Sequence, residues 1–419
     1  MTRLKEELRD QGPIYIAIIG AGLMGSYLLA GLEKLDHIKV ALVASRHIDK
    51  IKSLCQTQDI KDYQVVHDQR GARRAFDQGQ LAITENTSLA WSLEGIHCLV
   101  DCTGNPQAGA EIAFRGLENK KHVVSFNVEC DVLVGHKLQA LARDRGLCYT
   151  LAAGDEPSAI MELYDFADFI GLEVLALGKG KNNPLHVEAT PESLKEEAQK
   201  KGVSPRMLTS FVDATNTMLE LNVVANATGF VPDVRGCHGI HAKVDSLKDS
   251  LTLEEEGGPL KTYGVLEYVH GIAPGVFALV HSDSKKVQEE MAYLSMGPGP
   301  NYILYRPYHL TSLEAPISIA KAVLRQEETI SHSGQIVAQT VAIAKRDIGA
   351  GEALEGIGSK TVYGQLEKAS VAQEEDLLPI SLIQASTRAR VPIKKGQAIH
   401  MDQVDLGENT FLQELYFKK

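Results

Sequence analysis

One stretch decides the fold of the first part of this chain: Ile14-Tyr-Ile-Ala-Ile-Ile-Gly20-Ala-Gly22-Leu23-Met24-Gly25. Its first six residues are apolar and rich in β-branched side chains, which is typical of a buried parallel strand. The three glycines have the G-x-G-x-x-G spacing, and apolar residues at helical spacing follow them. A second apolar run at 38–44 completes a strand, tight turn, helix and strand, which is one βαβ unit.

The same alternation continues beyond this unit. Apolar runs at 98–102, 122–126 and 148–152 predict further strands, and the patterns at 107–118 and 136–145 predict helices between them. Repeated βα units are typical of a doubly wound parallel sheet. We therefore predict an α/β protein with three domains: a Rossmann domain at 1–152, an α+β catalytic domain at 153–333 and a small β-rich domain at 334–419.

The glycine turn predicts a binding site for a dinucleotide. Gly20 permits the tight turn, Gly22 lets the backbone approach a pyrophosphate, and Gly25 lets the helix pack close to the strand. The helix that begins near Leu23 and Met24 offers N–H groups and a partial positive charge to that anion. The alternative is a glycine-rich turn without a ligand, which the flanking strand and helix disfavour.

The residues after the second strand indicate which nicotinamide coenzyme is bound. NAD enzymes usually carry Asp or Glu there, whereas this chain has Ala44-Ser45-Arg46. Because a guanidinium binds phosphate bidentately, Ser45 and Arg46 suit a 2′-phosphate, and we predict NADP, with NAD as the alternative. Thr103 and Gly104 follow a later strand and are expected to line the nicotinamide side of the cleft, unless they form an ordinary turn.

Polar clusters in the second domain are candidates for the chemistry. Asp155 and Glu156 suit a divalent metal or proton transfer, and a helix cap is the equal alternative. Lys179 and Lys181 flank a glycine at the end of an apolar strand. Lysines there can hold a substrate anion or polarise a carbonyl group during hydride transfer.

Two more clusters complete the candidate set. Asp213, Asn216 and Glu220 fall on one helix face, which would line the cleft or meet solvent. Arg306 and His309 lie among aromatic residues, where they would bind an anion or transfer a proton, or where the histidine would be structural. The predicted catalytic residues, of which Asp155 and Glu156 are also candidate metal ligands, are Lys179, Lys181, Asp155, Glu156, Asp213, Arg306 and His309.

Longer motifs carry a family resemblance. They are Gly154-Asp-Glu-Pro157, Gly178-Lys-Gly-Lys-Asn-Asn-Pro184, Ser210-Phe-Val-Asp213, Ala225-Asn-Ala-Thr-Gly229 and Arg306-Pro-Tyr-His-Leu310. In these segments the chain resembles the 1-deoxy-D-xylulose 5-phosphate reductoisomerase-like oxidoreductases, also described as homoserine dehydrogenase-like proteins with a C-terminal SAF domain. The resemblance implies a homodimer and an NADPH-dependent reductase or reductoisomerase, whose best-known activity belongs to isoprenoid biosynthesis. Segments 344–348 and 393–399 resemble an SAF domain, which would bind an anion or serve packing.

One departure from the family bears on the substrate. Where the family usually has Asp-Gly-Thr-Lys, this chain has Asp213-Ala-Thr-Asn216, so a cation that would hold a substrate anion is missing. We therefore predict a small anionic hydroxy-carbonyl substrate rather than a defined sugar phosphate. One alternative is a homoserine dehydrogenase or another polyol or hydroxy-acid dehydrogenase. Another is a non-catalytic sensor of nucleotide and sugar acid.

Net charge, the length of apolar runs and cysteine spacing limit the kinds of partner and the compartment that we expect. The net charge of −11 argues against general nucleic-acid binding, and no apolar run has the length of a membrane helix. The polar N-terminal segment from Met1 to Gly12 lacks the apolar stretch of a secretory signal. Six scattered cysteines without a Cys-x-x-Cys pair indicate reduced thiols. We expect a cytoplasmic enzyme with a small-molecule substrate and no membrane or nucleic-acid partner.

Overall fold

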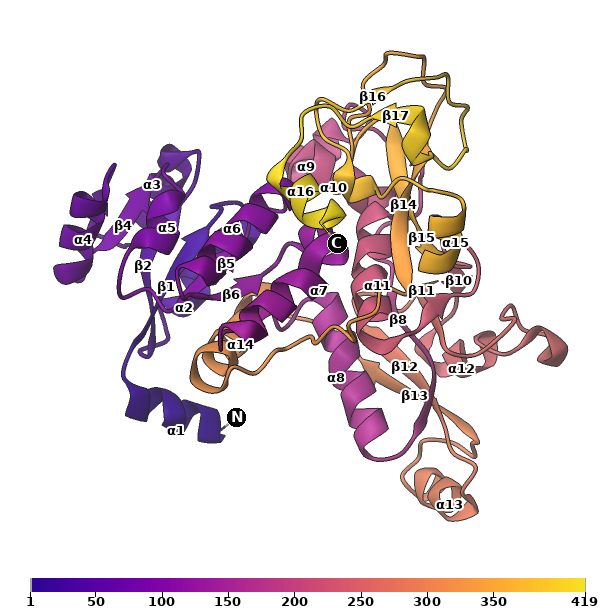
Figure 1. Cartoon of the computed structure of the whole chain (residues 1–419). Helices are drawn as coiled ribbons and strands as arrows, with labels where there is room; N and C mark the ends of the chain where they lie inside the picture. The colour runs from indigo at the N-terminus through magenta and orange to yellow at the C-terminus, as the bar shows by residue number, and fades with distance from the viewer. Residues whose placement is uncertain (1, 419) are drawn as a thin grey trace. The chain divides into compact units, whose positions relative to one another are not determined.

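The computed structural model describes residues 2–418 and divides into two compact units (Figure 1). Unit 1 combines Met1–Ser158 with Leu310–Ser331 and Thr410–Lys419, and unit 2 combines Ala159–His309 with His332–Asn409. The three domains expected from the sequence stay a prediction, while these two units define where each candidate site lies.

Unit 1 is built on a parallel sheet of seven strands in the order β3-β4-β2-β1-β5-β6-β7. The strands are β1 (Ile14–Ile19), β2 (Ile38–Ala44), β3 (Tyr63–Val65), β4 (Leu81–Thr84), β5 (Cys98–Asp101), β6 (His122–Ser125) and β7 (Tyr149–Leu151). The chain order reverses on either side of β1, which confirms the doubly wound arrangement. A ligand of such a sheet binds at the carboxyl ends of the strands near this reversal.

Helices pack against this sheet in two groups. α2 (Leu23–Leu32), α3 (Ile48–Thr57) and α14 (Thr311–Arg325) share one buried apolar cluster with the isoleucines of β1. α6 (Pro106–Glu118) packs against α7 (Val128–Asp144) and α16 (Phe411–Phe417). Figure 1 shows α14 in orange and α16 in yellow among the purple elements of unit 1, so the chain returns twice to complete this unit. The remaining helices here are α1 (Thr2–Gln11), α4 (Gln69–Asp77) and α5 (Ser88–Ser92).

Side-chain caps explain where two of these helices begin. The Asn105 side chain accepts a hydrogen bond from the Ala108 N–H at 2.9 Å, and Pro106 occupies the first turn of α6. The Asn127 side chain accepts from the Cys130 N–H at 3.1 Å at the start of α7. Both helices therefore start directly after a strand, at the carboxyl edge of the sheet.

Unit 2 is built on a mixed sheet of six strands, ordered β10-β11-β8-β12-β13 with β9 beside β11. The strands are β8 (Glu173–Gly180), β9 (Val231–Pro232), β10 (Ile240–His241), β11 (Val265–His270), β12 (Val276–His281) and β13 (Asn301–Arg306). β10, β11 and β8 are parallel, and β12 is antiparallel to β8 and β13. The helices are α8 (Glu156–Phe169), α9 (Lys195–Lys201), α10 (Pro205–Val212), α11 (Thr215–Thr228), α12 (Leu247–Ser250) and α13 (Lys285–Tyr293).

The C-terminal segment of unit 2 consists of two short antiparallel hairpins. They are β14 (Ala338–Ala344) with β15 (Val362–Lys368) and β16 (Arg388–Ala389) with β17 (Val404–Asp405), and α15 (Ala369–Glu374) follows β15. Asn222 of α11 donates to the Ala338 carbonyl at 2.8 Å and accepts from the Thr340 N–H at 2.9 Å. The first hairpin is thereby fixed to α11, and the expectation of a small β-rich C-terminal part is confirmed.

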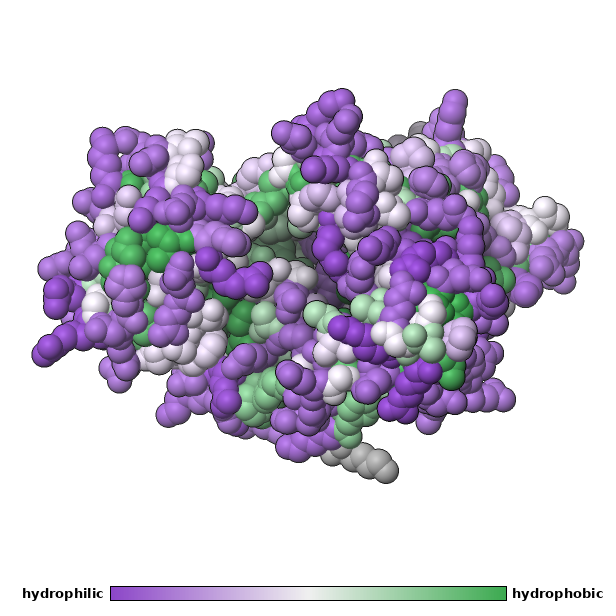
Figure 2. Space-filling view, turned by 90° about the horizontal axis from the view of Figure 1, so that it is seen from above, coloured by the Kyte–Doolittle hydropathy of each residue, from purple (hydrophilic) through white to green (hydrophobic). Residues whose placement is uncertain are grey.

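Hydrophilic side chains cover most of the face shown in Figure 2. Among the helices of residues 2–418, none has both the length and the apolar character that a membrane span needs.

Candidate active site

The glycine turn of unit 1 is tightly packed at two of its three glycines and open at the third. Gly20 has φ +102°, and a Cβ there would lie 2.7 Å from the Cys102 carbonyl oxygen. A Cβ at Gly25 would lie 2.0 Å from the Gly20 carbonyl oxygen. Gly22 precedes α2, and a Cβ there would meet open space. Packing therefore requires Gly20 and Gly25, whereas Gly22 leaves the helix N-terminus accessible to an anion.

The first turn of α2 contains Leu23 and Met24. The Met24 carbonyl accepts a hydrogen bond from the Ser312 hydroxyl at 3.3 Å, which ties this turn to α14. The first N–H groups of a helix have no intrahelical partner, so this turn presents donors to a ligand.

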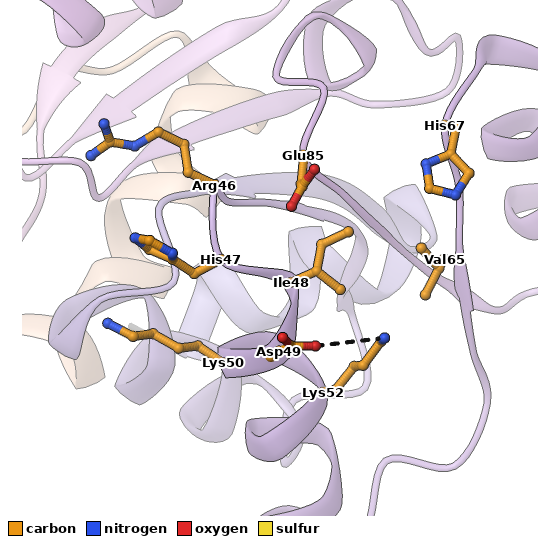
Figure 3. A pocket seen from close by; sticks show the side chains of 9 residues that line it. All are labelled: Arg46, His47, Ile48, Asp49, Lys50, Lys52, Val65, His67 and Glu85. Atoms are coloured by element: carbon orange, nitrogen blue, oxygen red, sulfur yellow. Dashed lines mark ion pairs between the residues drawn. The ribbon is translucent and has the colours of Figure 1, made fainter.

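A pocket of about 680 Å³ opens beside the end of β2 (Figure 3). Most of its polar lining is basic, with two carboxylates, and it is formed by Arg46, His47, Ile48, Asp49, Lys50, Lys52, Val65, His67 and Glu85. Lys52 pairs with Asp49 at 3.8 Å. Within residues 2–418, the exposed Arg46 makes neither an ion pair nor a hydrogen bond through its guanidinium. Arg46 lines this pocket, and Ser45 directly precedes it in the chain; their role in binding a 2′-phosphate stays a prediction.

The loop after β5 is held by a buried carboxylate that sequence reasoning missed. Asp101 accepts hydrogen bonds from the Thr103 N–H at 2.9 Å and from its hydroxyl at 2.6 Å. Its other oxygen accepts from the Asn127 side-chain amide at 3.0 Å. Burial raises the pKa of Asp101, and these hydrogen bonds act in the opposite direction. These hydrogen bonds fix the position of Thr103. Gly104 has φ +56°, and a Cβ added there would meet open space.

In unit 2, Lys179 lies in β8 and Lys181 directly follows the last residue of this strand, Gly180. Both are buried, with 5% and 6% of their surfaces exposed. A Cβ at Gly178 would lie 1.9 Å from the Glu267 carbonyl oxygen, and a Cβ at Gly180 would lie 2.4 Å from the Ala273 nitrogen. Packing therefore requires both glycines. The glycines thus allow tight contacts at the end of β8, where the ammonium groups of Lys179 and Lys181 are buried.

These two lysines have different partners. Lys179 Nζ forms an ion pair with Glu220 of α11, whose second oxygen accepts from the Asn216 amide at 2.6 Å. Lys181 Nζ donates to the Phe211 carbonyl oxygen at 2.7 Å. Burial, followed by the charge of Lys179, lowers the pKa of Lys181 to about 8. Lys181 can therefore hold or release a proton near neutral pH.

Asp213 occupies a buried position at the corner between α10 and α11. Its carboxylate pairs with Lys345 at 2.7 Å and accepts from the Thr215 N–H at 2.9 Å. Lys345 also donates to the carbonyl oxygens of Ala189 and Ser359, each at 2.7 Å. Asp213 is 0% exposed, so it does not belong to a solvated helix face. Its contacts connect α10 and α11 to the C-terminal hairpin segment.

The remaining predicted residues lie at the ends of other elements. Arg306, the last residue of β13, pairs with Glu162 of α8 at 2.6 Å and stacks on the Tyr308 ring, with its Cζ 4.8 Å from the centroid. Its charge is therefore already compensated. His309 is partly buried after β13. Asp155 and Glu156 lie at the start of α8, where Glu156 is buried.

Sequence reasoning also missed two histidines on the unit 2 sheet. The register pairs His241 of β10 with His270 of β11, and their rings stack with centroids 4.4 Å apart. Tyr268 meets the His270 ring edge-on at 5.6 Å. Burial is the main cause that lowers the pKa of His270, followed by the charges of His241 and Lys181. The only local signal was a histidine at the end of each apolar strand.

Comparison with known families indicates the class of the second part of the chain. Residues 154–315 match the model of an oxidoreductase catalytic domain, and this segment follows the doubly wound sheet of unit 1 along the chain. The matching model is described as the catalytic domain of the oxidoreductase DRL. A comparison with characterised protein sequences finds no significant match.

Several solved structures are similar at low sequence identity. An NADPH-dependent oxidoreductase described as putative, from Desulfitobacterium hafniense, is 10% identical, with a TM-score of 0.39 over 74% of this chain and 87% of that one. DOX-P reductoisomerase in complex with NADPH, fosmidomycin and magnesium is 14% identical, with a TM-score of 0.44 over 77% and 72%. Scyllo-inositol dehydrogenase from Lactobacillus casei is also 14% identical, with a TM-score of 0.39 over 70% and 76%. These similarities concern the fold alone.

Proposed function

We propose that this protein is an NADPH-dependent reductase of a small anionic hydroxy-carbonyl compound. The buried pair Lys179 and Lys181, inside the segment that matches an oxidoreductase catalytic domain, carries the proposal. Lys179 is neutralised by Glu220, whereas Lys181 has a pKa of about 8. A proton donor with a pKa near the working pH serves best when a carbonyl oxygen becomes an alkoxide.

The bond changes follow from these roles. When bound, NADPH supplies a hydride to the carbonyl carbon. The carbonyl oxygen takes a proton from the Lys181 ammonium, so the product is an alcohol and Lys181 is left neutral until solvent reprotonates it. The Lys179–Glu220 pair positions the substrate beside this ammonium.

NADPH is the proposed coenzyme because of the residues around the glycine turn. Gly20, Gly22, Leu23, Met24 and Gly25 would bind the pyrophosphate at the start of α2. The 2′-phosphate would bind Arg46, which lines the basic pocket beside β2, and the neighbouring Ser45. Thr103 and Gly104 would line the nicotinamide side, with Thr103 held by Asp101.

A divalent metal is part of the proposal through Asp155 and Glu156. Two adjacent carboxylates at the start of α8 are the hard oxygen donors that Mg²⁺ and Mn²⁺ prefer. A metal held there would polarise an oxygen of the substrate as a Lewis acid. A homodimer, which the family resemblance implies, remains part of the same proposal.

The substrate is proposed to be smaller than a typical sugar phosphate. Asn216 replaces a lysine of the family pattern, and its amide is bonded to Glu220. No charge is therefore available from this position. Reduction of a keto acid or short hydroxy-ketone fits better than rearrangement of 1-deoxy-D-xylulose 5-phosphate.

Steady-state oxidation of NADPH with a panel of keto acids, small ketoses and 1-deoxy-D-xylulose 5-phosphate tests the function. We expect turnover of an anionic ketone, which Lys181→Met lowers about 100-fold while NADPH affinity stays unchanged. Lys201→Met is the matched control, because Lys201 pairs only near the surface, with Glu197 at 2.8 Å and with Asn183. Tight NADPH binding without any turnover would instead support the nucleotide sensor, and absence of NADPH binding would contradict both.

A further inference from the structure

Three basic side chains form a row across neighbouring strands of the unit 2 sheet. His241 pairs with His270 in the register of β10 and β11. The Lys181 N–H donates to the Val269 carbonyl at 2.9 Å, so Lys181, directly after β8, lies level with His270, the last residue of the adjacent parallel strand β11. Because β8, β11 and β10 are parallel, all three side chains lie at one edge of the sheet.

Exposure increases along this row. Lys181 is buried, His270 is partly buried and His241 is exposed. Neighbouring strands are about 5 Å apart, so the row extends about 10 Å from the buried ammonium to solvent. A ligand that follows it would enter at His241 and place its far end at Lys181.

Lys181, His270 and His241 can still donate hydrogen bonds to a ligand, whereas three other basic groups of unit 2 are paired with carboxylates. Lys179, Lys345 and Arg306 are each paired with a carboxylate. In the part of the chain that the structure describes, the imidazoles of His270 and His241 pack against other rings and make no hydrogen bond or ion pair, and Lys181 uses one of its three N–H donors, on Phe211. Burial, followed by the charges of His241 and Lys181, lowers the pKa of His270, and a bound anion would act in the opposite direction.

We propose that His270 and His241 form the subsite that binds the oxyanion of the substrate, a carboxylate or a phosphate, beside Lys181. This inference rests on the proposed function, because it places the reacting carbonyl at Lys181. The anionic group then lies about one or two strand spacings away, roughly 5–10 Å. Arg306, expected from the sequence to hold the anion, is compensated by Glu162 and is not needed for this role.

Nuclear magnetic resonance of the histidine side chains in the full-length protein tests the subsite, with inorganic phosphate and oxalate as separate probes. We expect saturable shifts of the His270 and His241 resonances and none at His281, whose ring is held by Asn301 and Asp283. His270→Gln and His241→Gln should each weaken binding of the active probe about tenfold. A response to phosphate alone indicates a phosphate ester, and a response to oxalate alone indicates a carboxylate; both support the subsite.

The inference is overturned when neither probe shifts these resonances, or when His281 responds equally. The steady-state assay separates it from the proposed function. If the enzyme reduces an anionic ketone and His270→Gln keeps the same KM, the subsite is wrong and the reductase stands. If both anions bind at the histidines but no ketone is reduced, the subsite stands and the reductase fails.

Discussion

Replacing Lys345 by Met tests whether Asp213 serves the structure or the chemistry. The substitution leaves the Asp213 carboxylate buried without its ammonium partner and removes the donor from the Ala189 and Ser359 carbonyls. Breaking such a buried pair costs about 3–5 kcal/mol. In a unit of this size each kcal/mol lowers Tm by about 2–4 °C, so we expect a decrease of roughly 6–20 °C.

Thermal unfolding followed by circular dichroism measures this change. Asp213→Asn combined with Lys345→Met removes both charges and should unfold at a higher temperature than Lys345→Met alone. Lys394→Met is the control, because its pair with Asp347 is exposed and contributes less than about 1 kcal/mol.

The turnover of Asp213→Asn distinguishes a structural role of Asp213 from a catalytic one. If Asp213 is structural, Asp213→Asn keeps its turnover within about threefold when assayed well below its Tm. A Tm decrease below about 2 °C for Lys345→Met refutes the buried-pair argument. A loss of turnover of about 100-fold in a folded Asp213→Asn protein would return Asp213 to the catalytic residues.

Three further predictions concern the coenzyme and the proton donor. Gly25→Ala places a Cβ 2.0 Å from the Gly20 carbonyl oxygen, so calorimetry should show NADPH binding weakened at least about tenfold; unchanged affinity contradicts the packing argument. Arg46→Ala removes a charged hydrogen bond of about 1.5–3 kcal/mol, so the Kd for NADPH should rise about 10–100-fold and that for NADH should not change. Lys181 must be protonated to act as the proton donor, so kcat should fall as the pH rises above its pKa of about 8. A kcat that stays level to about pH 9.5 would exclude this role.

The fold was predictable where a local pattern repeats. The glycine turn after β1 indicated the doubly wound unit, and the alternation of apolar runs predicted its central strands. β3 and β4 have only three and four residues, too few to show a period. α7 begins at Val128, earlier than its apolar pattern, because the Asn127 side chain caps it and the first turn contains Glu129 and Asp131.

The site was predictable only in part, for a similar reason. Lys179 and Lys181 stand out beside the glycines of one strand. The histidine pair depends on the register between β10 and β11, and Asp213 depends on Lys345 far along the chain. No local pattern contains either relation, because long-range pairing is decided by tertiary packing.

The return of α16 to unit 1 affects how the protein is made. Lys137 of α7 donates to the carbonyls of Leu415, Tyr416 and Lys418 at 2.6–2.9 Å, and Phe411 packs on Phe114 with centroids 5.0 Å apart. On the ribosome, α6 and α7 are synthesised well before α16, so their packing against α16 must wait for it. A messenger with a premature stop before Phe411 would yield polypeptides whose α6 and α7 keep an uncovered apolar surface, which chaperones and proteases recognise.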